Sequence, residues 1–341
     1  MRTIRWDDGA VVTIDQTQLP AKLVFLKLKT CSDVAKAIKS MRIRGAPLIG
    51  AAAALGLALT ASQSKAKDRR ELIIELRDSA ILLKSTRPTA VNLAWAVDQV
   101  VRRVGETRGA IGDLKSVVLD EALEIAESDA QTNRRLGRAG AKLLEDGDTV
   151  LTHCNAGALA TVEYGTALGV IRAAVEEGKK IKVIATETRP LLQGARLTAF
   201  ELINEGIPVT LITDGMAAYV MKNRMVDKVI VGADRVLRSG HVYNKIGTLS
   251  LAVLAKAYSL PFYVAAPTST IDLDSEPDDV VIEQRDPREI LFIYGQRIAP
   301  DGVKVLNPAF DLTPPEYVTA IITEEGVFPP KAVRKALEHS E

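Results

Sequence analysis

The chain has 341 residues, of which 47% are hydrophobic and 26% charged, and its formal net charge is +1. This length suggests two domains and this composition is typical of a soluble globular protein, while the small net charge gives no general attraction to nucleic acid or other polyanions. Two distant cysteines and three histidines exclude a disulfide framework and argue against a zinc site. The charged start, MRTIRWDDG, lacks a signal-peptide pattern, so we expect a cytoplasmic protein.

The first part of the chain is predicted to be mainly helical after a small β hairpin. TIRW and AVVTID flank an Asp-Gly pair, which is a strong hairpin signal between β-rich runs. Ser32 is expected to cap a helix that continues DVAKAIKSM, and further helices are expected at 68–84, 93–104 and 113–144. We expect Glu145–Asp148 to link a helical domain, 1–145, to a second domain, 146–341.

One stretch is long and uncharged enough to resemble a membrane span. Residues 45–64 contain no charged side chain. Most of them are Ala and Gly, which give weak hydropathy, and a helix that is apolar on all sides is also typical of the middle of a large domain. We therefore predict a buried helix and no membrane partner.

After residue 146, continuous Val- and Ile-rich runs alternate with helical segments. Such runs are typical of parallel strands that are buried on both faces, and their alternation with helices predicts a doubly wound α/β sheet with right-handed crossovers. The six expected strands are TVLTHC (149–154), IKVIAT (181–186), PVTLIT (208–213), KVIVGA (228–233), PFYVAA (261–266) and VKVLN (303–307).

Cys154 is the first candidate for a reacting group. It follows the TVLT run and precedes Asn155 and Gly157, and we expect GALATVEYGTALGVIRAA after it to form a helix. A strand that turns directly into a helix leaves free N–H groups with the helix dipole behind them, which binds anions and favours a thiolate. The alternative is that Cys154 is a small core residue, and His153 is more simply explained as a structural residue.

The other strands also end in polar residues, and in open α/β sheets ligands bind at this edge. No GxGxxG and no GxxxxGK[ST] pattern is present, so the single phosphate of a sugar phosphate fits better than a nucleotide. Arg44 and Arg87, each followed closely by a Pro-initiated helix, and Lys245 are candidate cations, although exposed basic turns are a common alternative. Asn244 and the amides of Gly45 and Ala46 are neutral donors.

Asp234 is the candidate acid or base. It follows the KVIVGA run, so it is expected to project from a strand end into the cleft. A carboxylic acid with a raised pKa in a dry site can donate a proton to a reacting group. An Asp at this position can equally be the N-cap of the next helix.

Together these segments resemble one family, the methylthioribose-1-phosphate isomerases of the initiation-factor-2B-like superfamily. The resemblance runs in order from about residue 30 to residue 328. The matching motifs are RGAP (44–47), RPTAVN (87–92), THCNAGALAT (152–161), ETRPLLQGARLTAFEL (187–202), GADR (232–235), NKIGT (244–248), NPAFDLTP (307–314) and AIITEEGV (320–327).

The resemblance implies conversion of 5-methylthioribose 1-phosphate to 5-methylthioribulose 1-phosphate, a step of methionine salvage, without metal or nicotinamide. It also implies a helical domain on a Rossmann-like domain, and a homodimer. Cys154 and Asp234 would be the catalytic pair. The implied substrate contacts are Arg44, Gly45, Ala46, Arg87, Gln193, Asn244 and Lys245.

Two relatives of this family are alternatives. Ribose-1,5-bisphosphate isomerase is similar but tends to read HCHS at the cysteine motif, and the regulatory subunits of the eukaryotic initiation factor 2B complex lack the catalytic set. Ala156 and Leu191 depart from the Thr and Tyr common at these positions, which bears on fine specificity rather than on the reaction.

Overall fold

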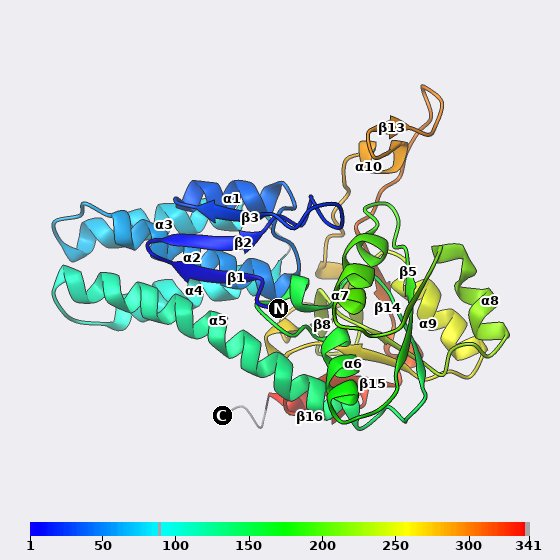
Figure 1. Cartoon of the computed structure of the whole chain (residues 1–341). Helices are drawn as coiled ribbons and strands as arrows, with labels where there is room; N and C mark the ends of the chain where they lie inside the picture. Colours follow the sequence, from blue (N-terminus) through cyan, green and yellow to red (C-terminus); the bar gives the residue numbers. More distant parts are fainter. Residues whose placement is uncertain (88–89, 338–341) are drawn as a thin grey trace. The chain divides into compact units, whose positions relative to one another are not determined.

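The structure, a computed structural model, describes residues 1–87 and 90–337 and is traced in Figure 1. The chain forms two compact units, Met1–Arg135 with Gly157–Gly169, and Leu136–Ala156 with Val170–Glu341. The segment 157–169 therefore leaves the second unit, joins the first, and returns. Residues 145–148 lie inside the second unit, and the expected domain boundary at residue 145 stays a prediction.

The first unit begins with a three-stranded antiparallel sheet in the order β1-β2-β3. The predicted hairpin is confirmed as β1 (Ile4–Asp7) and β2 (Ala10–Ile14), and β3 (Phe25–Leu28), which the sequence did not suggest, pairs with β2. Five helices follow, and their bounds are α1 (Cys31–Lys39), α2 (Ala46–Gln63), α3 (Arg69–Lys84), α4 (Val91–Glu106) and α5 (Ile111–Ala141).

The cap of α1 is Thr30, so the expectation of Ser32 was wrong. The Thr30 hydroxyl accepts from the backbone N of Asp33 at 3.1 Å, and the Asp33 carboxylate accepts from the backbone N of Thr30 at 3.0 Å. This reciprocal capping box satisfies two N–H groups at once, which a cap at Ser32 inside the first turn would not.

The uncharged stretch forms α2, and it is a core helix, as predicted. By length and composition α2 could cross a membrane, but 78% of it is buried inside the structure. It packs against α1, α3 and α4. Its small residues permit this contact, because a Cβ at Gly50 would lie 2.8 Å from the Asn92 carbonyl oxygen of α4.

The second unit contains a seven-stranded sheet in the order β16-β15-β10-β7-β4-β5-β6, which confirms the predicted parallel α/β sheet. Only the edge strand β16 (Gly326–Phe328) runs antiparallel. The parallel strands are β4 (Thr149–Thr152), β5 (Lys182–Thr186), β6 (Val209–Ile212), β7 (Lys228–Val231), β10 (Phe262–Ala265) and β15 (Ala320–Thr323). The helices between them are α6 (Ala167–Glu176), α7 (Ala199–Asn204), α8 (Ala217–Lys222) and α9 (Thr248–Ala257).

A smaller sheet in the same unit has the order β11-β8-β9-β14. Its strands are β8 (Arg235–Leu237), β9 (Val242–Lys245), β11 (Ile271–Asp272) and β14 (Phe310–Thr313). β8 and β9 form a hairpin directly after β7, so the polar residues that follow β7 lead into this sheet.

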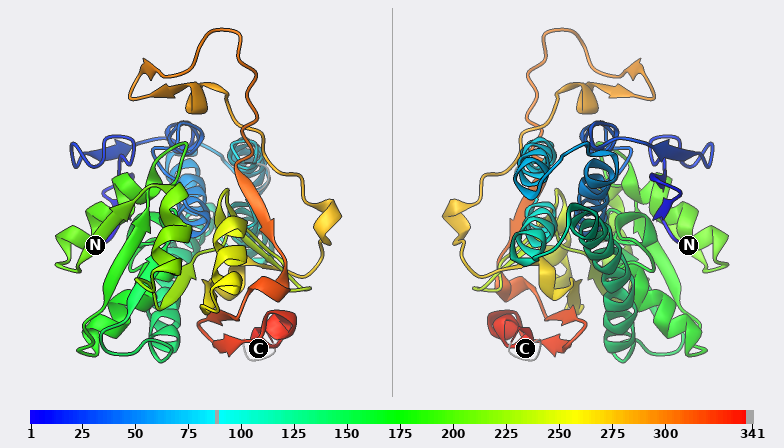
Figure 2. Two further views of the ribbon diagram at one scale, coloured as in Figure 1. Left: turned by 90° about the vertical axis from the view of Figure 1, so that its right-hand side faces the viewer. Right: turned by 90° about the vertical axis from the view of Figure 1, so that its left-hand side faces the viewer.

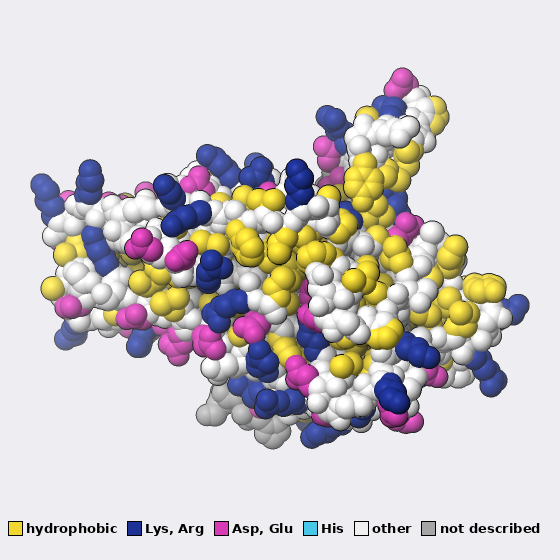
Figure 3. Space-filling model, in the orientation of Figure 1, with side chains coloured by type: hydrophobic (Ala, Val, Ile, Leu, Met, Phe, Trp, Pro, Cys, Tyr) yellow, Lys and Arg dark blue, Asp and Glu magenta, His cyan; other side chains and the backbone are white. Residues whose placement is uncertain are grey.

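The expected strand at 303–307 is wrong. Residues 303–306 end a segment, 273–306, that projects from the body of the second unit (Figure 2, orange), and Asn307 follows it. It contains α10 (Arg288–Leu291) and a hairpin of β12 (Phe292–Ile293) and β13 (Gln296–Arg297). Apolar side chains gather on this segment (Figure 3), and Val281, Tyr294 and Leu306 are 77%, 81% and 78% exposed. Of this run, Asn307 accepts a hydrogen bond from Arg285 N at 2.9 Å beside an isolated bridge between Gln284 and Pro308, and residues 303–307 form no strand.

Candidate functional site

Cys154 lies just beyond the end of β4, in a left-handed backbone conformation with φ of 62°. The expected helix does not begin here. A single 3-10 turn spans Ala158–Ala160, and α6 starts only at Ala167. The Thr161 hydroxyl donates to the Glu163 carbonyl at 2.9 Å and accepts from Gly165 N at 3.2 Å, and such local bonds compete with a helix. The argument from a helix dipole behind Cys154 is therefore wrong.

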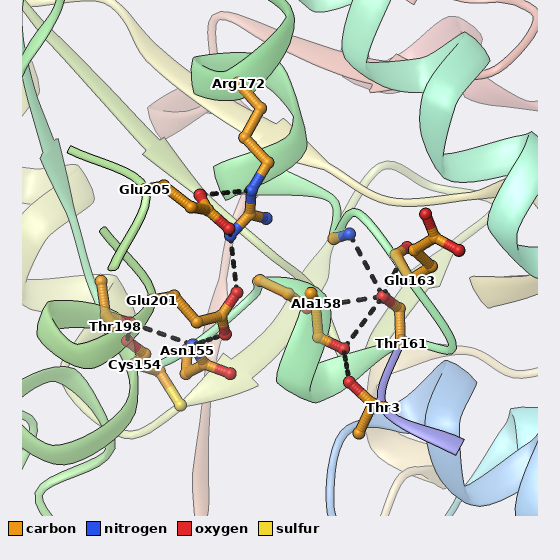
Figure 4. A network of polar contacts seen from close by, with 12 residues as sticks. Thr3, Cys154, Asn155, Ala158, Thr161, Glu163, Arg172, Thr198, Glu201 and Glu205 are labelled. Carbon is orange, nitrogen blue, oxygen red and sulfur yellow. Dashed lines mark hydrogen bonds and ion pairs between the residues drawn. The ribbon is translucent and has the colours of Figure 1, made fainter. Parts of the chain in front are cut away.

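Two threonine hydroxyls hold the backbone of Cys154 instead. The Cys154 N–H donates to Thr188 Oγ1 at 2.8 Å. The Cys154 carbonyl accepts from Thr198 Oγ1 at 2.6 Å, and Figure 4 labels both of these residues. The thiol itself is half-buried, whereas the other cysteine, Cys31, is buried. The loop thus presents its thiol from a fixed backbone.

Thr188 and Thr198 come from the loop after β5 and from the turn that begins α7. Thr188 has φ of 64°, and both its N–H and that of Arg189 donate to the Asp214 carboxylate, at 2.8 and 2.7 Å. The chain then forms a π-type turn over Gly194–Thr198, a distortion that is frequent at functional sites. A Cβ at Gly194 would lie 1.8 Å from the Thr186 carbonyl oxygen, so only glycine fits there.

Gln193 lies between these two threonines in the sequence, and it is 2% exposed. Among the described residues its Oε1 atom is buried without a hydrogen-bond partner. Buried amide oxygens are nearly always paired in proteins, so an orphaned one needs an explanation, and a bound polar ligand is one.

Asp234 follows β7, the strand next to β4 in the sheet. Both strands are parallel, so Cys154 and Asp234 leave the sheet at the same edge. The Asp234 N–H donates to the Tyr243 carbonyl at 2.9 Å, and the next element is the strand β8. Asp234 is therefore not the cap of a following helix, which removes the alternative left open by the sequence.

Asn244 and Lys245 are the last two residues of β9, in the smaller sheet, and both are buried. Asn244 Nδ2 donates to Thr248 Oγ1 at 3.0 Å. The Lys245 ammonium donates to the Ala309 carbonyl at 3.0 Å and lies 4.7 Å from the centre of the Phe310 ring. These contacts fix the side chains at the start of α9.

Asp311, which the sequence analysis did not select, holds the N-terminus of α9 from the neighbouring strand β14. Its two carboxylate oxygens accept from the N–H groups of Gly247 and Leu249 at 2.7 and 3.1 Å. Burial raises the pKa of Asp311 to about 6 despite these bonds and nearby Lys245. Asp311 lies in the NPAFDLTP motif, which is the sequence feature by which it could have been selected.

His153 joins the end of β4 to the NKIGT turn and is structural, as the sequence favoured. Its Nε2 lies 2.9 Å from the Ile246 carbonyl, which can only accept, so Nε2 carries the hydrogen and Nδ1 accepts from Thr186 Oγ1 at 2.6 Å. Burial lowers the pKa of His153, which keeps the ring neutral. Gly247, with φ of 104°, leaves room for that ring, since a Cβ there would lie 3.0 Å from His153 Cε1.

The remaining predicted contacts belong to the first unit. Arg44 is buried, and Gly45 with φ of 101° leads into α2 at Ala46. A Cβ at Gly45 would lie 2.4 Å from the Ala160 carbonyl oxygen, so this position requires glycine for both its conformation and its space.

The Arg87 side chain contacts the turn that carries Arg44. Its Nη1 lies 3.3 Å from the Met41 sulfur, in the turn between α1 and α2. The structure therefore places the Arg87 side chain against the turn that also carries Arg44, and Pro88 and Thr89 lie outside the described residues. In residues 1–87 and 90–337, no three His, Cys, Asp or Glu side chains gather in a group that could hold a metal ion.

Residues 42–330 match the initiation factor 2 subunit family. The chain belongs to this family. It is 52% identical over 341 residues to "Methylthioribose-1-phosphate isomerase" of Desulforudis audaxviator, an alignment that covers 99% of this chain and 98% of the relative. The resemblance expected from the motifs is therefore confirmed.

Two solved structures share both fold and sequence with this member of the family. The 5-methylthioribose 1-phosphate isomerase from Pyrococcus horikoshii OT3 superposes with a TM-score of 0.92 and 46% identity, covering 99% of this chain and 96% of that one. The translation initiation factor eIF-2B, subunit delta, from A. fulgidus gives a TM-score of 0.88 and 52% identity, covering 99% of both chains. The mixed α/β fold predicted from the sequence is thus confirmed.

Proposed function

We propose that this chain is an aldose–ketose isomerase that converts 5-methylthioribose 1-phosphate to 5-methylthioribulose 1-phosphate, a step of methionine salvage. The observation that carries this proposal is the shared sheet edge after β4 and β7, where Cys154 and Asp234 leave neighbouring parallel strands. The full-length identity to enzymes of that name supports the choice of substrate.

The phosphate on the anomeric carbon blocks the free aldehyde that most isomerases use, so the ring must first be opened. We assign to Asp234 the protonation of the ring oxygen, which breaks the bond between that oxygen and carbon one. The hydrogen on carbon two then passes to carbon one, and the hydroxyl on carbon two gives up its proton to become the ketone, which replaces the proton that Asp234 donated. We assign to Cys154 the stabilisation of the transition state of this hydrogen transfer. The orphaned Oε1 of Gln193 supports a third role, the acceptance of a hydrogen bond from a sugar hydroxyl.

The anomeric phosphate is assigned to the cationic and amide donors, which can pair with its oxygens. These proposed contacts are Arg44, Gly45, Ala46, Arg87, Asn244 and Lys245. The methylthio end needs apolar neighbours, and Leu191, Leu192, Met216 and Pro47 are the candidates because each adjoins a motif residue.

The direct test is to follow purified protein and 5-methylthioribose 1-phosphate by 31P NMR, with and without EDTA. We expect a ketose 1-phosphate to accumulate at the same rate in both samples. Ribose 1,5-bisphosphate should be nearly inert, because its second phosphate would be desolvated without a partner. 5-Deoxyribose 1-phosphate lacks the methylthio group and should react with modest loss, since an apolar pocket discriminates by only about 1–3 kcal/mol per methylene. A kcat/KM for the bisphosphate equal to that of the methylthio sugar would move the assignment to ribose-1,5-bisphosphate isomerase.

A second candidate is a non-enzymatic subunit of the initiation-factor-2B type. The translation initiation factor eIF-2B, subunit delta, from A. fulgidus favours it through 52% identity. The presence of Cys154, Asp234, Asn244 and Lys245 in this chain favours the enzyme. Absence of turnover by correctly folded protein on all three sugars would favour the subunit.

We further propose a homodimer in the cytoplasm. The exposed apolar side chains of the projecting segment 273–306 support self-association, because such patches mark protein–protein contacts. Light scattering after size-exclusion chromatography should give twice the mass of 36.8 kDa, and a monomer at all concentrations would refute the dimer.

A further inference from the structure

A buried charged cluster lies behind the Cys154 loop in the second unit (Figure 4). Arg172 of α6 bonds to Glu201 of α7 at 2.7 Å and to both oxygens of Glu205 at 2.7 and 2.9 Å. The side chains of Arg172 and Glu201 are 8% and 0% exposed. Burial alone would lower the pKa of the Arg172 guanidinium, but the two glutamates outweigh it and raise that pKa.

Glu201 uses its other oxygen to orient the residue after the cysteine. Asn155 Nδ2 donates to Glu201 Oε1 at 2.8 Å and also to Thr198 Oγ1 at 3.3 Å. A carboxylate only accepts, so the NH₂ end of the buried Asn155 amide must face Glu201. The charged pair therefore determines which way this amide points.

The direction of the remaining bond follows from the same argument. Thr198 Oγ1 accepts from Asn155, so its single hydrogen is available for the Cys154 carbonyl, which lies 2.6 Å away. One continuous set of hydrogen bonds leads from Arg172 through Glu201, Asn155 and Thr198 to the backbone of Cys154. That backbone has the left-handed φ that costs energy for a residue with a side chain.

We propose that Glu201 and Thr198 are positioning residues that hold Cys154 in its left-handed conformation and thereby aim its thiol. This proposal rests on the proposed function, which gives Cys154 its role at the reacting carbons. Second-sphere groups of this kind act by restricting a catalytic side chain to its productive geometry.

A matched pair of variants at Thr198 separates positioning from packing. Thr198→Val keeps the shape and removes the hydroxyl, whereas Thr198→Ser keeps the hydroxyl and removes a methyl group. We expect Thr198→Val to lower kcat by about 10- to 100-fold with little change in KM, and Thr198→Ser to retain most of kcat. Because Thr198 is fully buried, thermal melts of both proteins will report any loss of stability separately.

A second matched pair tests the charged cluster. Glu201→Gln leaves one acceptor oxygen for two donors, Asn155 and Arg172, so one of them must lose its bond. Glu205→Gln weakens the ion pair of Arg172 with Glu205 but leaves the Glu201–Asn155 bond in place. We expect a fall in kcat in the first variant that the second does not reproduce.

The thiol itself supplies a readout that does not depend on turnover. Iodoacetamide labelling, quantified on the Cys154 peptide by mass spectrometry, should be faster in Thr198→Val by about threefold or more and unchanged in Thr198→Ser, because the freed loop exposes the thiol. The buried Cys31 peptide serves as the internal control.

The outcomes distinguish the two proposals. Equal labelling and equal kcat in Thr198→Val and Thr198→Ser would overturn the positioning proposal, whatever the role of Cys154. Near-normal kcat in Cys154→Ala would overturn the catalytic role of Cys154, and labelling alone would then decide whether Thr198 orders the loop.

Discussion

The sheet edge after β4, β5 and β7 and the turn that leads into α2 hold their polar groups in different ways. At the sheet edge, side-chain hydroxyls and carboxylates bond to the backbone of the loops, as Thr188 and Thr198 do at Cys154. At the turn before α2, the backbone of Gly45 packs directly against Ala160, and Arg44 extends from that fixed point.

This difference indicates how strictly the orientation of the side chains must be controlled in each region. A thiol and a carboxylic acid act on particular atoms, so their orientation must be set by directional bonds. A guanidinium that binds a phosphate taking no part in the hydrogen transfer binds the substrate and the transition state equally, so its loss weakens binding without slowing the chemical step. We therefore expect changes at the sheet edge to alter kcat, and changes at the α2 turn to alter KM or stability.

The largest expected effect is at the sheet edge. Asp234→Asn and Cys154→Ala should each lower kcat by about two to four orders of magnitude, the usual range for a positioned acid–base group. Both residues lie in loops beyond strand ends, so circular dichroism and thermal melts should remain close to the parent protein. Cys31→Ala, in the core of the first unit, is the control for loss of a thiol. Near-normal kcat in Asp234→Asn would end its assignment as the acid.

At the α2 turn, the largest effect should be on stability. Gly45→Ala places a Cβ 2.4 Å from a backbone oxygen at φ of 101°, and should lower the unfolding free energy by about 3 kcal/mol or more. Gly9→Ala, at φ of 70° with nothing within 4 Å, is the matched control and should cost only about 1 kcal/mol of conformational strain. Urea denaturation measures both, and equal losses would show that the Ala160 contact is loose.

The carboxylate of Asp311 gives a pH-dependent test of the region beside the sheet edge. Its pKa of about 6 lies above the unfolded value of 3.8, so the folded state holds the proton more tightly. Its contribution is then fully present below pH 4 and is lost as the pH rises through 6, by up to about 3 kcal/mol. The stability advantage of the parent protein over Asp311→Asn should shrink between pH 4 and pH 7, as measured by denaturation. A constant difference across that range would contradict the raised pKa.

The smallest expected effect is at Arg87, and it tests whether this residue binds the phosphate or orients the reacting groups. Arg87→Ala should raise KM about tenfold and leave kcat within about threefold, since it removes one charge-assisted contact. Arg42→Ala is the control. Arg42 is an exposed arginine in the turn between α1 and α2, and its Nε lies 3.6 Å from Asp15 Oδ2. A fall in kcat without a change in KM would place Arg87 among the orienting groups and break the comparison.

Much of the fold could be predicted from periodicity. Five of the six apolar runs are parallel strands, and the long helices of the first unit lie close to their expected bounds. The run VKVLN failed because apolar composition does not reveal whether a neighbouring strand exists. The helix expected after Gly157 failed because the Thr161 hydroxyl and Gly165 form a local turn, which composition alone does not distinguish from a helix start.

The candidate site was predicted as a set of residues rather than as a geometry. The motifs named Cys154 and Asp234, and the strand order places both at one edge. Thr198, Glu201 and Asp311 were not selected, although each lies inside a motif. Their partners are far away in the chain, as for Asn155 and Glu201 at a separation of 46 residues, so no local pattern indicates the pairing.

The excursion of residues 157–169 into the first unit has a consequence for synthesis on the ribosome. Thr3 N and its hydroxyl bond to the carbonyls of Val162 and Ala158, and Asp129 accepts from Val162 N, so this segment completes the first unit. A nascent chain ending at residue 135 lacks these partners, and the bonds to Ala158 and Val162 can form only after these residues have left the exit tunnel. An N-terminal domain usually completes its contacts before the next domain is synthesised, whereas this unit takes residues 157–169 from beyond the first strand of the second unit. The start of the parallel sheet, β4, emerges before the first unit is complete.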